Sequence, residues 1–580
     1  MGLAYTIDSP IRVAHQGISS VISVMDDELI ERINNFYCKE FKLPYKEITT
    51  KIEDYRAKRI TSYLNTVDTI VKNKFQEVKK NLLESKKSVE DFLISLPNVS
   101  ELKNELEHYL ENNHSINYLK NILDEHFSPG SIDVNIMTKV DREHFKGKEA
   151  LPSINNDAHA ALRGFVNSNL KASVVLSAGM NPKLFSYFEE FSSFYPNENS
   201  LLEKKIILKV SDYRSAFIQG QQLAKKGLWV SEYRIESGLN CGGHAFATDG
   251  QLMGTILKSF QDRRNELIQT THDLLCKALA EKGKTVPKEP LKLVITAQGG
   301  VGTAAEHHFL LNHYQLDAVG WGSPFLLVPE ATSTDVNTRS LLAKADESDL
   351  YLSNISPLGI PFNTIKGTTN EYIKQQRIQK NNPGSSCPRK YLALDKTFDI
   401  EGTCTASRKH QKLALSKLEE QREQITQEVY QEQYEKITEK SCLCIGLANA
   451  SYLDLGLEIK GEEQGIVICP GPNIAYFTKE ATLKQMIDHI YGRTNLIETT
   501  ERPHFFIKEL GMYVDHYKKE KIDYEDEPTS IKLKKINKLK DNLLEGIAYY
   551  QKLFTTDLSF FANDSVKIQN KLNDYRLELN

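Results

Sequence analysis

The chain has 580 residues, 26% of them charged, and a formal net charge of −4, which describes a soluble protein too long for one ordinary domain. The small net charge excludes a basic field that would attract nucleic acid, and no apolar run reaches the roughly 18 residues of a membrane-spanning helix. Eight cysteines in so long a chain, with no secretory leader in its first 13 residues, predict a reducing cytoplasm.

The chain opens with a predicted barrel strand. Residues 11–24 combine β-branched residues with a glycine turn, and we place this first strand in residues 1–25. Residues 26–130 are different, because Gly17 and Gly130 have no glycine between them and apolar residues recur at helical spacing over 60–82. We therefore predict a helical insertion after the first strand. It packs on the core in the simplest interpretation; a lid, a dimer contact and a partner surface are the alternatives.

Strands and helices alternate from residue 131 to residue 345. The segments between the strands have the length of helices, and residues 251–282 read as one long helix. Short β-branched runs mark the strands at 132–137, 172–177, 205–210, 228–233, 293–297 and 318–319. This alternation predicts an α/β fold with a parallel sheet, here a (β/α)8 TIM barrel. With the first strand the count is seven, and we look for the eighth near residues 162–166.

Residues 346–580 form a predicted α-rich C-terminal extension, with a charged helix over 407–440 and helices again from about 502. Five of the eight cysteines lie in it: Cys387, Cys404, Cys442, Cys444 and Cys469. Two of them precede proline, a context also found at iron–sulfur ligands, but none forms the Cys-x-x-Cys pair typical of zinc sites. Inert thiols, an iron–sulfur cluster and a zinc site are the three interpretations.

Two neighbouring predicted strands end in glycine turns. The strand at 293–297 runs into Gly299 and Gly300, and the strand at 318–319 runs into Gly322 and Ser323. The loops after the last two strands of a parallel barrel commonly form a phosphate site. Glycine lets backbone N–H groups approach an anion with no Cβ in the way. We predict that these four residues hold the phosphate of a cofactor.

Six short motifs stand at predicted strand ends in chain order. They are 134–136 (Val-Asn-Ile), 178–182 (Ala-Gly-Met-Asn-Pro), 208–211 (Leu-Lys-Val-Ser), 240–244 (Asn-Cys-Gly-Gly-His), 299–301 (Gly-Gly-Val) and 322–323 (Gly-Ser). Together they resemble the superfamily of FMN-dependent nitronate monooxygenases (2-nitropropane dioxygenase-like) and flavin-type enoyl-acyl-carrier-protein reductases, including trans-acting enoyl reductases of polyketide and polyunsaturated fatty acid synthesis. The resemblance covers roughly residues 1–340 without the helical insertion, and it implies a TIM barrel that binds FMN.

The resemblance also implies roles for individual residues. His244 matches the histidine over the flavin, where an imidazole that titrates near neutrality serves as acid or base. Lys209 matches a lysine near the flavin ring. The remaining implied cofactor contacts are Gly17, Asn135, Gly242 and Gly243. The family pattern usually continues from the histidine with Pro-Gly, whereas here Ala-Phe follows, and this departure leaves the substrate open.

Three functions follow as expectations. The first is a nitronate-monooxygenase-like oxidation of a small nitronate or another activated carbon acid by O2. The second is NAD(P)H-dependent reduction of enoyl chains bound to an acyl carrier. The third is a non-catalytic flavin-binding scaffold. The expected partner is a small-molecule or carrier-bound substrate, with no nucleic acid and no membrane; a homo-oligomer is a further alternative.

Overall fold

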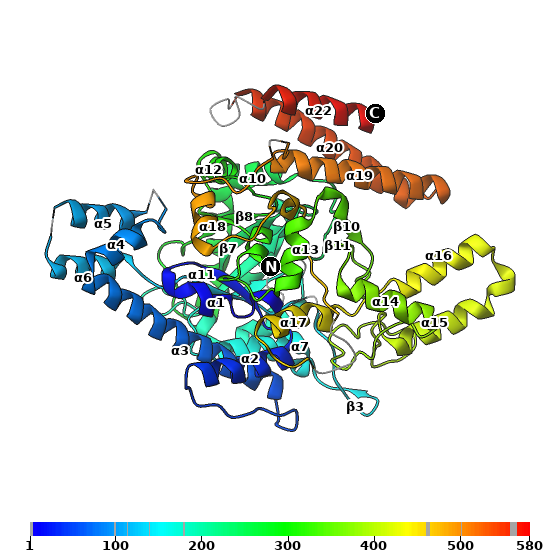
Figure 1. The fold of residues 1–580 in the computed structure, drawn as a ribbon, viewed down its shortest axis with the longest axis horizontal. Helices are drawn as coiled ribbons and strands as arrows, with labels where there is room; N and C mark the ends of the chain where they lie inside the picture. Colours follow the sequence, from blue (N-terminus) through cyan, green and yellow to red (C-terminus); the bar gives the residue numbers. More distant parts are fainter. Residues whose placement is uncertain are drawn as a thin grey trace.

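The computed structural model describes residues 4–97, 100–112, 114–138, 140–177, 180–459, 465–499, 501–556 and 565–580 (Figure 1). At its centre lies one parallel sheet of seven strands in the order β1-β2-β5-β6-β7-β8-β9. The strands are β1 Ser20–Ser23, β2 Ile132–Asn135, β5 Ser173–Leu176, β6 Lys205–Val210, β7 Val230–Glu236, β8 Val294–Gln298 and β9 Ala318–Gly320. Neighbours in the sheet are also neighbours in the chain, as repeated βα units require. Within the described residues no pairing joins β9 to β1.

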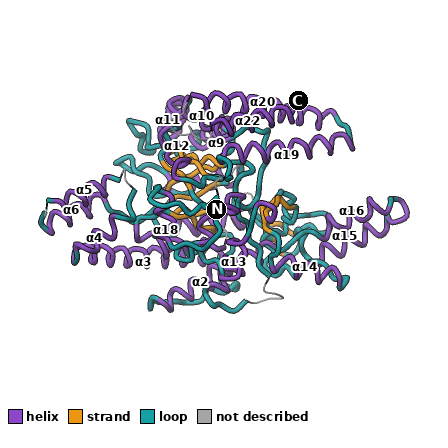
Figure 2. Tube along the Cα trace, turned by 45° about the horizontal axis from the view of Figure 1, so that its top comes forward, coloured by secondary structure: helices purple, strands orange, loops and turns teal. Residues whose placement is uncertain are grey.

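Helices enclose the sheet (Figure 2). Most side chains of the sheet's strands are buried or half-buried, and every residue of β2 is buried. The helices that follow the strands are α7 Asp157–Val166, α8 Pro182–Tyr187, α9 Tyr213–Ala224, α10 Met253–Asp262, α11 Arg264–Glu281 and α12 Ala304–His313. Three of them, α8, α9 and α12, begin after polar residues whose side chains cap them, as Asp212 does for α9.

Six predicted strands are confirmed within a few residues, and three expectations are corrected. The segment before β1 begins as a short helix, α1 Ser9–Val13, because Pro10 stands in its first turn, where proline favours a helix. The eighth strand sought at 162–166 is wrong, since Leu162 and Phe165 are buried at helical spacing in α7. The predicted long helix is two helices, α10 and α11, which meet at Arg263.

Helices fill the chain between β1 and β2, where the sequence predicts a helical insertion. Its helices are α2 Asp27–Glu40, α3 Tyr55–Glu84, α4 Lys86–Leu93, α5 Glu101–Glu111 and α6 Ile116–His126. The first half of α3 packs on α2 and α7 and enters the main core, with Ile60, Leu64 and Val67 fully buried. Helices α4 to α6 close a separate apolar cluster around the far end of α3 and project from the body (Figure 1). The insertion therefore has an anchored half and a projecting half.

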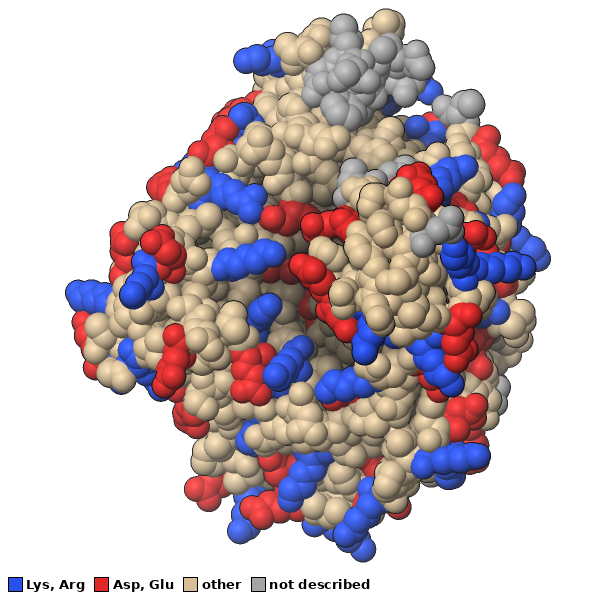
Figure 3. All heavy atoms as spheres, turned by 90° about the vertical axis from the view of Figure 1, so that its left-hand side faces the viewer, with Lys and Arg blue, Asp and Glu red and all other residues tan. Residues whose placement is uncertain are grey.

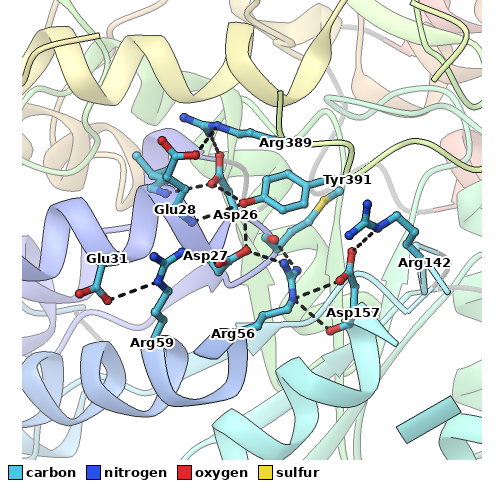
Figure 4. Close-up of polar contacts among 12 residues, drawn as sticks. Asp26, Asp27, Glu28, Glu31, Arg56, Arg59, Arg142, Asp157, Arg389 and Tyr391 are labelled. Carbon is cyan, nitrogen blue, oxygen red and sulfur yellow. Dashed lines mark hydrogen bonds and ion pairs between the residues drawn. The ribbon is translucent and has the colours of Figure 1, made fainter. Parts of the chain in front are cut away.

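A buried charge network anchors this insertion (Figure 4). Asp27, at the start of α2, pairs with Arg56 at 2.7 Å and with Arg59 at 2.8 Å, both from α3. The hydroxyl of Tyr391, from the C-terminal extension, donates to Asp27 at 2.9 Å. Arg56 also faces Asp157, the first residue of α7, at 3.7 Å. One carboxylate thus joins three parts of the chain in a buried place, where removing a single partner is costly.

The described part of the C-terminal extension is mostly helical. Its elements, with the helix before them, are α13 Val336–Lys344, β10 Leu350–Ser353, β11 Phe362–Ile365, α14 Thr369–Gln379, α15 Arg408–Glu420, α16 Gln427–Thr438, α17 Leu443–Asp454, α18 Leu483–Ile490, α19 Phe505–Asp526, α20 Ser530–Thr556 and α22 Ser565–Leu579. The charged helix predicted over 407–440 is instead the pair α15 and α16, which projects at one side (Figure 1). Helices α19, α20 and α22 pack together, and α19 and α20 rest on α10. Their side chains belong to the same apolar core as the strands.

Positive and negative side chains interleave on the face that carries the helical insertion (Figure 3), in keeping with the small net charge. No helix among the described residues has the length and apolar character needed to cross a membrane.

Candidate functional site

Two adjoining cavities lie at the carboxyl ends of the strands, the edge where parallel sheets bind ligands. The smaller has a volume of about 50 Å³ and is bordered by the turns after β8 and β9. The larger has a volume of about 130 Å³ and is bordered by the ends of β2, β6 and β7. Both share Glu236, Cys241 and Gly242, so they form one elongated site with two compartments.

All the predicted catalytic and cofactor-binding residues except Gly17 line this site. Those in the smaller compartment are Gly242, Gly299, Gly300, Gly322 and Ser323. Those in the larger compartment are Asn135, Lys209, Gly242, Gly243 and His244. Gly17 borders neither, because β1 begins only at Ser20 and Gly17 therefore precedes the strand, beside Phe127, at the opposite end of the sheet. Ala178 and Gly179, from the second motif, lie outside the described residues.

The turn after β8 needs its glycines. Gly299 and Gly300 have φ values of 123° and 79°, a region that other residues rarely adopt. A Cβ on Gly300 would lie 2.0 Å from Nδ2 of Asn240, which is buried under this turn. The two glycines thus bring the turn onto the loop that follows β7, and the backbone of both segments borders the smaller compartment.

Three hydrogen-bonded polar side chains, one from each of three neighbouring strand ends, lie between the compartments. Lys209 on β6 donates to Glu236 on β7 at 2.7 Å, and Gln298 on β8 donates to the other oxygen of Glu236 at 3.0 Å. Burial by itself would raise the pKa of Glu236, but attraction to Lys209 and these hydrogen bonds outweigh it and lower the pKa to about 2. Glu236 is therefore ionised at neutral pH. Sequence reasoning missed it, since no motif marks it.

The C-terminal extension holds the loop that carries His244. Nε2 of His244 lies 2.7 Å from Oγ of the buried Ser356, and its ring meets that of Phe362 edge-on at 4.9 Å. The backbone N–H of Ala245 donates to the carbonyl of Pro361 at 2.9 Å. His244 thus stands half-buried in the wall of the larger compartment, with its ring oriented by a segment about 110 residues further along the chain.

The arrangement of the cysteines gives no support for a metal site among the described residues. Burial raises the pKa of Cys241 to about 12, so its thiol is protonated at neutral pH. Cys387 and Cys404 are hydrogen-bonded to each other, whereas the thiol of Cys469 lies 2.8 Å from the hydroxyl of Tyr5. Among the described residues, no three His, Cys, Asp or Glu side chains are arranged to hold a metal ion. The iron–sulfur and zinc interpretations, which included Cys442 and Cys444, therefore lack support.

A much larger cavity of about 1460 Å³ lies between the start of α12 and helices α19 and α22. Its wall includes the buried ion pair of Glu306 and Arg502, whose other side faces the turn after β8. Apart from this pair, acidic side chains outnumber basic ones around it. None of the predicted site residues lines it, and we do not assign the chemistry to it.

Several solved structures resemble this chain distantly, among them two enzymes. No protein-family model matches the chain, and no curated protein matches it. The enoyl reductase domain of MlnA from the macrolactin biosynthesis cluster of Bacillus amyloliquefaciens is 15% identical, with a TM-score of 0.33, over 75% of this chain and 87% of that one. Nitroalkane oxidase from Streptomyces ansochromogenes is 9% identical, with a TM-score of 0.30, over 65% of this chain and 83% of that one.

At TM-scores this low, the likeness carries no weight for the reaction or the substrate. The function proposed below rests on the geometry of the site.

Proposed function

We propose that this chain is an FMN-dependent oxidoreductase whose parallel sheet is the barrel of the nitronate monooxygenase and flavin enoyl reductase superfamily. The phosphate of FMN would occupy the smaller compartment and the isoalloxazine ring the larger one. One observation carries the proposal: two compartments that share Glu236, Cys241 and Gly242 have glycine turns at one end and His244 at the other.

The chemical character of the residues in the two compartments suits the two ends of FMN. The turns after β8 and β9 offer backbone N–H groups to a phosphate, as glycine-rich turns do. The larger compartment combines apolar walls from Val140, Leu358 and Ile360 with the polar groups of Lys209 and His244, a mixture suited to a flavin ring. The compartments are smaller than the roughly 300–1,000 Å³ of typical ligand pockets, so we expect their loops to move apart when FMN binds.

FMN, when bound, supplies the redox chemistry, and the protein positions it and sets the charge around it. Lys209 would place a cation beside the ring. Its present partner, Glu236, holds the ammonium group at the strand end instead of letting it extend into solvent. A cation fixed in this way favours the form of the ring that carries negative charge, and little reorganisation is needed at the moment of reaction.

His244 would move the proton. With a nitroalkane, it would take the proton from the carbon next to the nitro group, which leaves the nitronate. In an enoyl reductase it would place the carbonyl of the acyl chain. Ser356 holds one ring nitrogen of His244 and thus the orientation of the imidazole.

The leading reaction is oxidation of a small activated carbon acid with O2. The apolar wall formed by Val140, Leu358 and Ile360 favours a second candidate, the NAD(P)H-dependent reduction of a carrier-bound enoyl chain, because acyl carbons need such a surface. The two reactions differ in their source of electrons. Mixing the yellow holoprotein with NADPH under anaerobic conditions separates them: rapid loss of the flavin's visible absorbance supports the reductase, and unchanged absorbance supports the oxidase.

The proposal itself is tested by reconstitution. Apoprotein incubated with FMN and freed of excess ligand should retain flavin, and a protein that never retains FMN refutes the proposal. His244→Gln should retain FMN while turnover falls by about 10²–10⁴-fold, the usual loss when a proton-transfer group is removed. Full turnover in the His244→Gln variant would show that His244 does not carry the proton, whereas a wild type that retains FMN and turns over neither substrate class would favour the non-catalytic scaffold.

A further inference from the structure

A C-terminal arm, defined here as residues 469–473 and 502–509, closes around the glycine turns of the smaller compartment. The backbone N–H of Gly471 donates to Oγ of Ser323 at 2.7 Å. Nδ2 of Asn473 donates to the carbonyl of Val301 at 2.9 Å. Gly471 also approaches Gly242 so closely that a Cβ on Gly471 would lie 3.1 Å from the Gly242 nitrogen. Segments more than 140 residues away thus contact both glycine turns and the loop of His244.

Arg502 is the most engaged residue of this arm. Its guanidinium donates to the carbonyl of Gly300 at 2.8 Å, to Oδ1 of Asn473 at 3.0 Å and to Oε1 of Glu306 at 2.7 Å. Only 6% of the Arg502 side chain is exposed, against 3% for Glu306. The fork of arginine is rigid, so these contacts together fix the arm relative to the turn after β8.

Glu306 explains why a cation is needed at this point. It caps α12, accepting the backbone N–H groups of Gly302 at 2.9 Å and Thr303 at 3.2 Å. Burial would raise the pKa of Glu306, but the charge of Arg502 outweighs burial and lowers it, so the carboxylate is ionised. A negative carboxylate therefore lies at a helix N-terminus directly behind the turn proposed to hold a phosphate, and Arg502 neutralises it.

Arg502 also sets the orientation of the turn. In a trans peptide the carbonyl and the following N–H point in opposite directions. Because the carbonyl of Gly300 points to Arg502, the N–H of Val301 points away from it, and Val301 borders the smaller compartment whereas Arg502 does not. The bond from Asn473 holds the next carbonyl, that of Val301, in the same manner.

We propose that Arg502 is a positioning residue for the cofactor phosphate and that the C-terminal arm forms an integral part of the phosphate site. This inference rests on the proposed function. It adds that selectivity for a phosphorylated flavin depends on a segment outside the barrel, through the neutralised Glu306 and the fixed carbonyl of Gly300.

The test compares FMN with riboflavin, which has the same ring and no phosphate. Apoprotein is titrated with each flavin, and binding is followed by flavin fluorescence. We expect Arg502→Gln to weaken FMN binding by at least about tenfold and riboflavin binding by less than about threefold. A variant that is only loosened in structure loses both alike, and that result, or equal affinity to wild type for both flavins, overturns the inference.

Asn473→Ala is the milder second variant, in case Arg502→Gln folds poorly, and the same loss of preference for FMN is expected. Arg493→Gln is the matched control, because Arg493 bonds to Asp488 and Leu96 away from the glycine turns, and both affinities should stay at the wild-type values.

A measurement with inorganic phosphate separates this inference from the proposed function. Inorganic phosphate should raise the melting temperature of the wild type and not that of Arg502→Gln. A wild type that retains neither flavin refutes the proposed function. An equal effect of phosphate on both proteins refutes the role of Arg502.

Discussion

Glu509 on α19 is a buried carboxyl group directly beneath the site, and it makes the stability of the protein depend on pH. Only 1% of Glu509 is exposed; it accepts hydrogen bonds from Oγ of Ser237 at 2.6 Å and from the backbone N–H of Met253 at 2.8 Å. Burial outweighs these bonds and raises the pKa of Glu509 from 4.5 to about 7. This difference corresponds to about 3 kcal/mol of folding free energy.

The direction in which stability changes with pH follows from the protonation of Glu509 in the folded and unfolded chain. Below pH 4.5 Glu509 is protonated in both the folded and the unfolded chain, and its contribution to stability is fully present. Between pH 4.5 and about 7 the unfolded chain releases the proton while the folded protein keeps it, so stability falls as pH rises. Glu509→Gln cannot ionise and retains an amide that accepts from one partner and donates to the other. From pH 4.5 to pH 8, the stability of the variant should therefore rise by about 3 kcal/mol relative to the wild type.

Thermal denaturation at the two pH values measures this change. For a chain of 580 residues that unfolds cooperatively, about 3 kcal/mol corresponds to roughly 2–3 °C in Tm. Glu525→Gln is the control, because Glu525 is exposed on the same helix and its Tm difference from the wild type should not depend on pH. A pH-independent difference for Glu509→Gln would show that the pKa of Glu509 is the same in the folded and the unfolded chain, and it would refute the reasoning.

Three further predictions concern other parts of the molecule. Gly300→Ala should weaken FMN binding by more than about tenfold, measured by fluorescence titration, because its Cβ would meet Asn240 at 2.0 Å and the turn must move. Lys204→Met should lower the free energy of unfolding by about 2–4 kcal/mol, measured by urea denaturation. The buried ammonium group of Lys204 donates to three backbone carbonyls at and just after the end of α7, and these carbonyls would lose their partner. An unchanged denaturation midpoint would contradict this. Asp27→Ala should destabilise by about 3–5 kcal/mol, because it leaves two buried arginines without their carboxylate, and limited proteolysis should then release the helical insertion first.

The order of the strands followed directly from the sequence. Short β-branched runs separated by helix-length segments admit few arrangements other than consecutive parallel strands, and β2 and β5 to β9 lie where the pattern predicted them. The first strand was placed too early because Ile11 and Val13 suit a strand by residue type, whereas Pro10 begins a helix there. The supposed strand at 162–166 shows the limit of a five-residue apolar run, which has the same composition in a buried helix.

The residues of the site fall into the same two groups, those that the sequence predicted and those that it did not. His244, Lys209 and the glycine turns were predicted from sequence because each belongs to a motif at or after the carboxyl end of a strand, and the strand ends of a parallel sheet meet at one edge. Glu236, Ser356 and Arg502 were not found. Each is an ordinary polar residue in its local sequence, and its importance comes only from the partner that it meets in the folded chain.

By itself, then, the sequence determined the parallel sheet, the helical insertion and the residues at the strand ends, because these depend on local spacing and on the periodicity of apolar residues. Only the tertiary structure decided that the extension after residue 345 closes over the same edge, with Arg502 behind the turn at Gly300 and Ser356 against His244. Contacts between segments 100–200 residues apart leave no periodic trace in the chain, since they arise only when burial brings charged and polar groups together and each must find a partner.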